Sequence, residues 1–236
     1  MPLDRAALKL RAKETIKTSN PNVISVGLVV LLLSIIINML SARLMGLNMS
    51  QSEAMNYMTY VSEGNYDAAL RYLDRMQPPG SAHAIDFLLT VIRSILEAGF
   101  IIFLLNTIRC TQPCFGNLLD GFGFFFKIIL LNFLSALFIA LWGMLLVVPG
   151  IIAAYRYSQA IYILVDDPTK SAMQCLRESK AMMRGHKMEL FKLNMSFFGW
   201  YLLASLPTMG YVIQAWTLPY TSMTYALYYE RLAYDV

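Results

Sequence analysis

The sequence predicts an all-α membrane protein: a polytopic bundle of about six transmembrane helices with a short helical extracytoplasmic loop. Three observations predict this class. Hydrophobic residues make up 57% of the 236 residues and charged residues only 14%, a balance typical of membrane proteins rather than soluble domains. The apolar residues are gathered into long runs separated by charges, whereas a soluble core spreads them at helical or strand periods. Basic residues recur in alternate loops, as the positive-inside rule requires.

The first three predicted spans are each about as long as a helix must be to cross the hydrocarbon, roughly 20 residues. Residues 23–42 contain no charge, and the absence of a following A-x-A-like cleavage site favours an anchoring helix over a signal peptide. Residues 85–108 form the second run, which carries Arg93 and Glu97, and residues 128–148 form the third.

The fourth predicted span, residues 151–165, directly follows Pro149 and Gly150. Pro149 lacks an amide hydrogen and crowds the preceding turn, and Gly150 permits a reversal of the chain. We therefore expect a helical hairpin that breaks at Pro149 and Gly150. The alternative is one kinked helix, but residues 128–165 far exceed the length of a single crossing.

The last two predicted spans are residues 190–212 and 213–232, and their boundaries stay open because Pro207, Gly210 and Pro219 fall within them. With six spans, both termini lie in the cytoplasm and the whole of residues 1–236 forms one membrane domain.

Two basic segments fall on the predicted cytoplasmic side: an N-terminal helix within residues 1–22 and an amphipathic helix within residues 167–187. The loop of residues 43–84 falls on the opposite side and is too long for a simple connector. It contains two stretches with apolar residues at helical spacing. We expect these two short helices to cap the bundle, to rest in the membrane interface, or to bind a partner.

The segment 167–187 predicts a helix capped by Asp167 and terminated by Gly185. Its basic residues fall at positions i, i+3, i+7 and i+10 and form a stripe: Arg177, Lys180, Arg184 and Lys187. Such a stripe suits the anionic headgroups of an inner leaflet. The alternative is a topology signal that binds no specific ligand.

Arg156 falls toward the middle of the fourth span, where an unpaired charge is costly. Glu97 is expected at a comparable depth, and Arg93 lies one helical turn from Glu97. We therefore predict an intramembrane polar cluster of Arg93, Glu97 and Arg156. As a functional site it would hold an anion or a lipid headgroup, and as a structural feature it would orient helices.

Other classes of site find little support. The three cysteines, Cys110, Cys114 and Cys175, do not form a redox or zinc motif. The two histidines have no neighbouring ligands at metal-binding spacing, and the net charge of +4 is too small to indicate nucleic-acid binding. No motif for catalysis or for a cofactor appears. The aromatic residues that lie mostly in or near span ends are interpreted as interfacial belt residues: Tyr155, Tyr157, Tyr211, Tyr220, Tyr225, Tyr228, Tyr229, Trp142, Trp200 and Trp216.

The segment "VVPGIIAAYRYSQAIYILVDDPTKSAMQCLRESKAMMRGHKMELFKLNMSFFGWYLL" resembles the bacterial family of integral membrane proteins known as domain of unknown function 975. The resemblance is carried by Pro149-Gly150-Ile151, Tyr157, Asp167-Pro168, Ser179, Met183, Gly185-His186, Phe191 and Ser196-Phe197-Phe198-Gly199-Trp200. Similarity extends to the N-terminal basic helix and the C-terminal segment, and is weakest over residues 43–84. It implies a multispan helical protein of the bacterial plasma membrane, without an established activity. Similar domains accompany some glycerophosphodiester phosphodiesterases, but we expect no such hydrolase activity here.

These observations predict a non-enzymatic integral membrane protein whose basic cytoplasmic face engages membrane lipids, in particular anionic inner-leaflet headgroups, or a membrane-protein partner, a second copy of the chain included. The alternative is a small transporter or permease component that uses the Arg93, Glu97 and Arg156 cluster.

Overall fold

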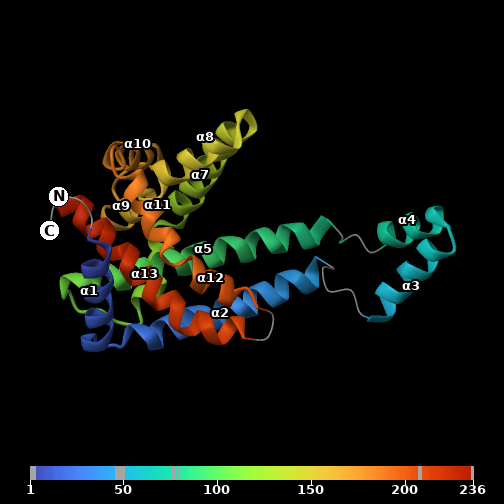
Figure 1. Ribbon diagram of the computed structural model, residues 1–236, viewed down its shortest axis with the longest axis horizontal. Coiled ribbons are helices and arrows are strands. Elements are labelled where there is room, and N and C mark those ends of the chain that lie inside the picture. The colour runs from blue at the N-terminus through green and yellow to red at the C-terminus, as the bar shows by residue number, and fades with distance from the viewer. Residues whose placement is uncertain (1–3, 46–50, 76–77, 79, 207–208, 235–236) are drawn as a thin grey trace. The chain divides into compact units, whose positions relative to one another are not determined.

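The computed structural model describes residues 4–45, 51–75, 78, 80–206 and 209–234. Within these residues the chain forms helices and no strand, which confirms the all-α class. The chain divides into two compact units: residues 1–31 together with 94–236, and residues 32–93. Figure 1 shows the elements of each unit in the colours of the chain.

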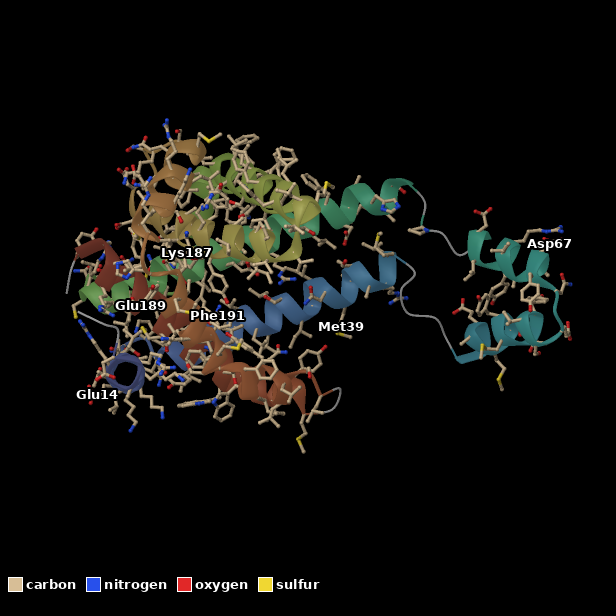
Figure 2. The ribbon with its side chains drawn as sticks, turned by 45° about the horizontal axis from the view of Figure 1, so that its top comes forward. Glu14, Met39, Asp67, Lys187, Glu189 and Phe191 are labelled. Atoms are coloured by element: carbon tan, nitrogen blue, oxygen red, sulfur yellow. The ribbon has the colours of Figure 1, made fainter. Side chains whose placement is uncertain are left out.

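Among the described residues, three helical segments are long and apolar enough to cross a membrane: Val23–Leu44, Gly80–Arg109 and Asn117–Leu145. The first is helix α2 and the second is α5, while the third combines α6 (Asn117–Asp120), the 3-10 turn η1 (Gly121–Phe124) and α7 (Phe125–Leu145). Large apolar side chains project from them, such as Met39 on α2, which is 64% exposed (Figure 2). Long helices with exposed apolar side chains of this kind are compatible with a membrane protein.

The other predicted spans are helical but less regular, and six spans are not confirmed. Residues 151–165 are divided between α8 (Val147–Tyr157) and α9 (Ala160–Asp166). The predicted span 190–212 falls on α11 (Lys187–Met195), α12 (Phe198–Ala204) and the first residues of the C-terminal helix, which begins at Gly210. The C-terminal helix α13 (Gly210–Tyr234) runs for 25 residues through Pro219, while Pro207 lies outside the described residues.

Helices α7 and α8 pack against each other as a hairpin, but the chain reverses at Leu146 rather than at Pro149 and Gly150. Leu146 is extended, with φ −161° and ψ 147°. Pro149 falls in the first turn of α8, where a missing amide hydrogen costs no helical hydrogen bond. Gly150 allows close packing, because a Cβ atom there would lie 2.8 Å from the Cα atom of Gly143.

The N-terminal basic helix α1 (Arg5–Thr18) packs against α13 and buries Leu8, Ala12 and Ile16. The Asp4 side chain caps it by accepting hydrogen bonds from two backbone amides. On its other faces, Lys9 Nζ donates to the carbonyl of Ser196 at 3.2 Å and lies 4.1 Å from the centre of the Phe197 ring. At least one basic residue of α1, Lys9, therefore makes contacts within the protein.

The second unit contains two short helices within the predicted loop 43–84. They are α3 (Gln51–Ser62) and α4 (Tyr66–Arg75), which pack together with the Tyr60 and Tyr72 rings 5.8 Å apart. Residues 46–50, 76–77 and 79 of this loop lie outside the described residues. The side of the membrane on which the loop lies stays a prediction.

Candidate functional site

Helix α10 (Ala172–Met182) presents the basic stripe on the first unit. Its inner face is fully buried, with Cys175, Leu176 and Ser179 each no more than 2% exposed, and it packs against α7, α8 and α9. Its outer face carries Arg177 and Lys180, both exposed. The helix is therefore docked through its apolar side and turns its cations outward.

The bounds of this helix differ from the predicted 167–187. Its cap is Ser171, whose hydroxyl accepts from the Gln174 amide at 3.3 Å, and not Asp167. The Asp167 carboxylate instead accepts a hydrogen bond from the Thr169 amide at 3.1 Å, in a turn before the helix. Both residue types are good helix caps, but the Asp167 side chain is already used in the turn, so Ser171 caps the helix.

The basic stripe is not continuous at its C-terminal end. Gly185 adopts φ +85° just beyond α10, as its position predicts. Lys187 then belongs to the next helix, α11, which also carries Glu189; both residues are labelled in Figure 2. The stripe on and directly after α10 thus consists of Arg177, Lys180 and Arg184.

These three cations are exposed and form no ion pair with any residue that the structure describes. The acid on the same helix, Glu178, is engaged elsewhere, because Lys170 Nζ lies 2.8 Å from its Oε2 atom. The hydrogen bond from Lys170 lowers the pKa of Glu178. The outer face of α10 therefore keeps an uncompensated positive charge.

The structure gives the surroundings of each residue of the predicted intramembrane cluster, Arg93, Glu97 and Arg156. Arg93 Nη1 donates to Asn38 Oδ1 at 3.3 Å within the second unit. Glu97 is exposed on α5 in the first unit. The Arg156 guanidinium lies 5.8 Å from the centre of the Trp142 ring, an aromatic partner that the sequence does not reveal. The cluster itself stays a prediction.

A charged network that sequence reasoning missed joins the ends of α5, α9 and α13. Arg109 binds Asp166 through Nη1 and Glu230 through Nε, each at 2.5 Å. The hydroxyls of Tyr229 and Tyr234 both donate to Asp166, at 2.9 and 2.7 Å. Charges at the ends of three predicted spans are the sequence signal that points to such a network, although it does not identify the pairs.

The electrostatics of this network follow from its contacts. Burial alone would raise the pKa of Asp166, but hydrogen bonds from Arg109, Tyr234 and Tyr229 lower it below its ordinary value. The network therefore depends on an ionised Asp166, and it holds three helix ends together.

Helix α10 supplies hydrogen-bond partners to the backbone at the break between α8 and α9. The Ser179 hydroxyl accepts a hydrogen bond from the backbone N–H of Gln159 at 3.2 Å and donates one to the backbone carbonyl of Arg156 at 2.9 Å. One side chain thus bonds to a backbone acceptor at the end of α8 and to a backbone donor within the interruption at residues 158–159.

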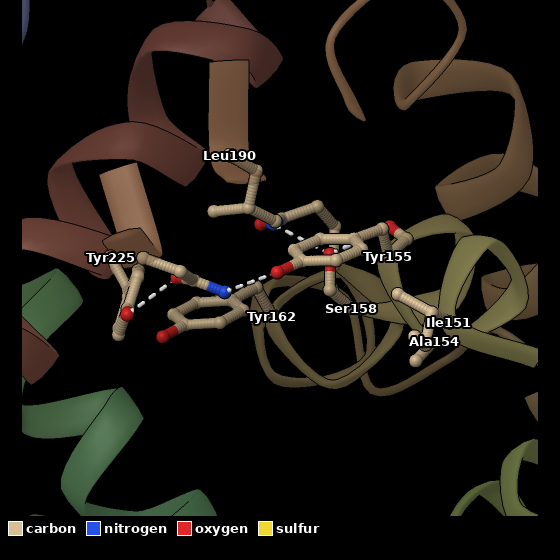
Figure 3. Close-up of a pocket in the computed structure, with 9 residues that line it drawn as sticks. Ile151, Ala154, Tyr155, Ser158, Tyr162, Leu190 and Tyr225 are labelled. Carbon is tan, nitrogen blue, oxygen red and sulfur yellow. Dashed lines mark hydrogen bonds between the residues drawn. The ribbon is translucent and has the colours of Figure 1, made fainter. Parts of the chain in front are cut away.

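A pocket of about 520 Å³ lies beside this break, within the first unit. It is lined by Ile151, Ala154, Tyr155, Ser158, Gln159, Tyr162, Leu190, Asn194 and Tyr225. Figure 3 shows these side chains as they come together from α8, α9, α11 and α13. Its lining contains no charged side chain.

A hydrogen-bonded chain crosses one wall of the pocket. Asn194 Nδ2 donates to the Tyr155 hydroxyl at 3.1 Å, and the Tyr225 hydroxyl donates to Asn194 Oδ1 at 2.6 Å (dashed in Figure 3). Tyr220, Tyr228 and Tyr229 are also turned inward, each no more than 6% exposed. The interpretation of these tyrosines as interfacial belt residues was therefore wrong for the buried ones.

The comparisons with known proteins place only part of this chain. No curated protein and no solved structure matches it. The segment that contains the pocket, α10 and the partners of Arg109 does have a match. Residues 144–235 match the model of a family described as "Protein of unknown function (DUF975)", which confirms the resemblance drawn from the sequence.

Proposed function

We propose that this chain is a multi-pass protein of the bacterial cytoplasmic membrane that engages anionic lipid headgroups through the outer face of α10. The supporting observation is that Arg177, Lys180 and Arg184 are exposed and unpaired with any described residue, on a helix whose opposite face is buried. Basic residues near a membrane surface attract anionic lipid by roughly 1 kcal/mol each. The proposal includes the predicted topology, with α10 and both termini in the cytoplasm.

The test compares lipid retention by the full chain purified in detergent. Native mass spectrometry after incubation with equal amounts of phosphatidylglycerol and phosphatidylcholine measures how strongly the anionic lipid is preferred. The variant R177Q/K180Q/R184Q should lose this preference by an order of magnitude or more, since three contributions of roughly 1 kcal/mol are removed.

The matched control removes two exposed arginines from the second unit, Arg43 and Arg71, by the same exchange to glutamine. It should keep the preference for phosphatidylglycerol. Equal retention of that lipid by the control and by the α10 variant would rule out α10 as the binding surface.

A further inference from the structure

We propose that the pocket beside the α8–α9 break binds a neutral acylglycerol, a lipid whose polar end carries free hydroxyls and an ester but no charge. This inference does not depend on the binding of anionic lipid by α10. It rests on three properties of the pocket: the hydrogen-bonding groups in its wall, the absence of charge in its lining, and its position between polar and apolar surfaces.

The hydrogen-bonding groups in the wall are incompletely used. Gln159 is only 3% exposed, and its Oε1 atom has no hydrogen-bond partner among the described residues. Its Nε2 atom donates to Ser158 Oγ at 3.1 Å. A buried amide that is half satisfied is costly, and a ligand hydroxyl supplies the missing partner.

Two phenol groups add donors. The Tyr155 hydroxyl accepts from Asn194 but donates to no residue that the structure describes. The Tyr162 hydroxyl makes no hydrogen bond within the described part of the chain, although its ring stacks on Tyr229 with centroids 5.4 Å apart. The wall therefore offers two donors for an ester carbonyl or hydroxyl oxygen, and one acceptor for a hydroxyl hydrogen.

The absence of charge in the lining sets the class of ligand. An anionic or cationic group placed there would lose its hydration without gaining a partner of opposite charge. Fatty acids and phospholipid phosphates are therefore disfavoured. A volume of about 520 Å³ is within the range of pockets that hold small organic ligands.

The position of the pocket suits an amphiphile. In one part of the lining, the backbone N–H of Gln159 donates to Ser179 of α10, the helix whose outer cations mark a polar surface. In another part, Ile151 is 49% exposed, and its neighbour Ile152 is 42% exposed. A glycerol group fits beside Gln159, and a hydrocarbon chain leaves past Ile151, the apolar end of the pocket.

The experiment measures the binding of tritiated 1-oleoylglycerol to the full chain in phosphatidylcholine nanodiscs. Saturable binding is expected. Tyr162→Phe should weaken it about 5- to 10-fold, as expected when one hydrogen bond is lost. Ile151→Trp, which fills the apolar end, should weaken it more than about tenfold by the same scale. Because Tyr162 donates to no described residue, its exchange leaves the packing of the protein intact.

The matched control is Tyr211→Phe, an exposed tyrosine on α13 outside the pocket lining, which should bind like the unaltered chain. Unlabelled oleate should compete far less well than unlabelled 1-oleoylglycerol. The variant R177Q/K180Q/R184Q should bind normally, which separates this site from α10. Absence of saturable binding, equal competition by oleate, or unchanged affinity in both pocket variants would overturn the proposal.

Discussion

The removal of the Arg109 side-chain charge should destabilise the protein more than the removal of any single exposed cation. Arg109 contacts Asp166 and Glu230 at 2.5 Å each, and the three side chains are 31%, 16% and 13% exposed. Exposed ion pairs contribute at most about 1 kcal/mol, whereas loss of one partner from a buried pair costs roughly 3–5 kcal/mol. For this half-buried network we expect Arg109→Met to lower the free energy of unfolding by about 2–3 kcal/mol.

The assay is thermal unfolding in detergent, followed by tryptophan fluorescence. At roughly 2–4 °C per kcal/mol for a chain of this size, Arg109→Met should lower the Tm by about 5–10 °C. Arg177→Met, which removes an exposed cation without a described ion-pair partner, serves as the control and should change it by about 1 °C or less. In Arg109→Met/Asp166→Asn the two effects should not add, since both changes break one contact. Equal Tm values for Arg109→Met and Arg177→Met would refute the structural role of the network.

Three further predictions concern stability. Because its folded-state pKa is lowered, Asp166 stabilises the protein at neutral pH and loses this effect as the pH falls below about 4; the Tm difference from Asp166→Asn should therefore shrink across a series from pH 7 to pH 3. Gly150→Ala should lower the Tm by several degrees, on the order of 1–3 kcal/mol of overpacking, while Gly199→Ala, whose Cβ meets nothing within 4 Å, should not. Ser179→Ala should cost about 1–3 kcal/mol, since it leaves two backbone groups without their partner; a melting curve that matches the unaltered chain would contradict this.

The helical class and the first three candidate spans follow from the sequence, because composition and run length alone decide them. The interruption at Ser158 and Gln159 does not, since neither residue is a helix breaker and the hydrogen-bond partner there, Ser179, is 20 positions away. The position of the chain reversal, at Leu146, does not follow from the sequence either. Pro149 marks the hairpin correctly, but a proline fits the first turn of the second helix as well as the turn itself.

The site is predictable only in part for a related reason. The exposed cations of α10 follow from helical spacing, because the buried face of that helix is apolar in sequence. The pocket does not follow, since nothing in the sequence around Tyr155 and Tyr225 tells whether these side chains face a membrane interface or a cavity. Their hydrogen bonds to Asn194 depend on the packing of α11 between α8 and α13, which a single sequence does not specify.

The two predicted spans that the structure divides share one physical requirement. A helix that breaks near hydrocarbon leaves backbone carbonyls without partners, at a cost of several kcal/mol each. The break after α8 is closed by Ser179 of α10, and the break after α11 is closed by Lys9 of α1, which bonds to the carbonyl of Ser196. Both closing helices are the basic segments that the positive-inside rule identifies. These two helices therefore supply hydrogen-bond partners to the divided segments through Ser179 and Lys9, and the exposed cations of α10 lie on a helix that also supports the pocket.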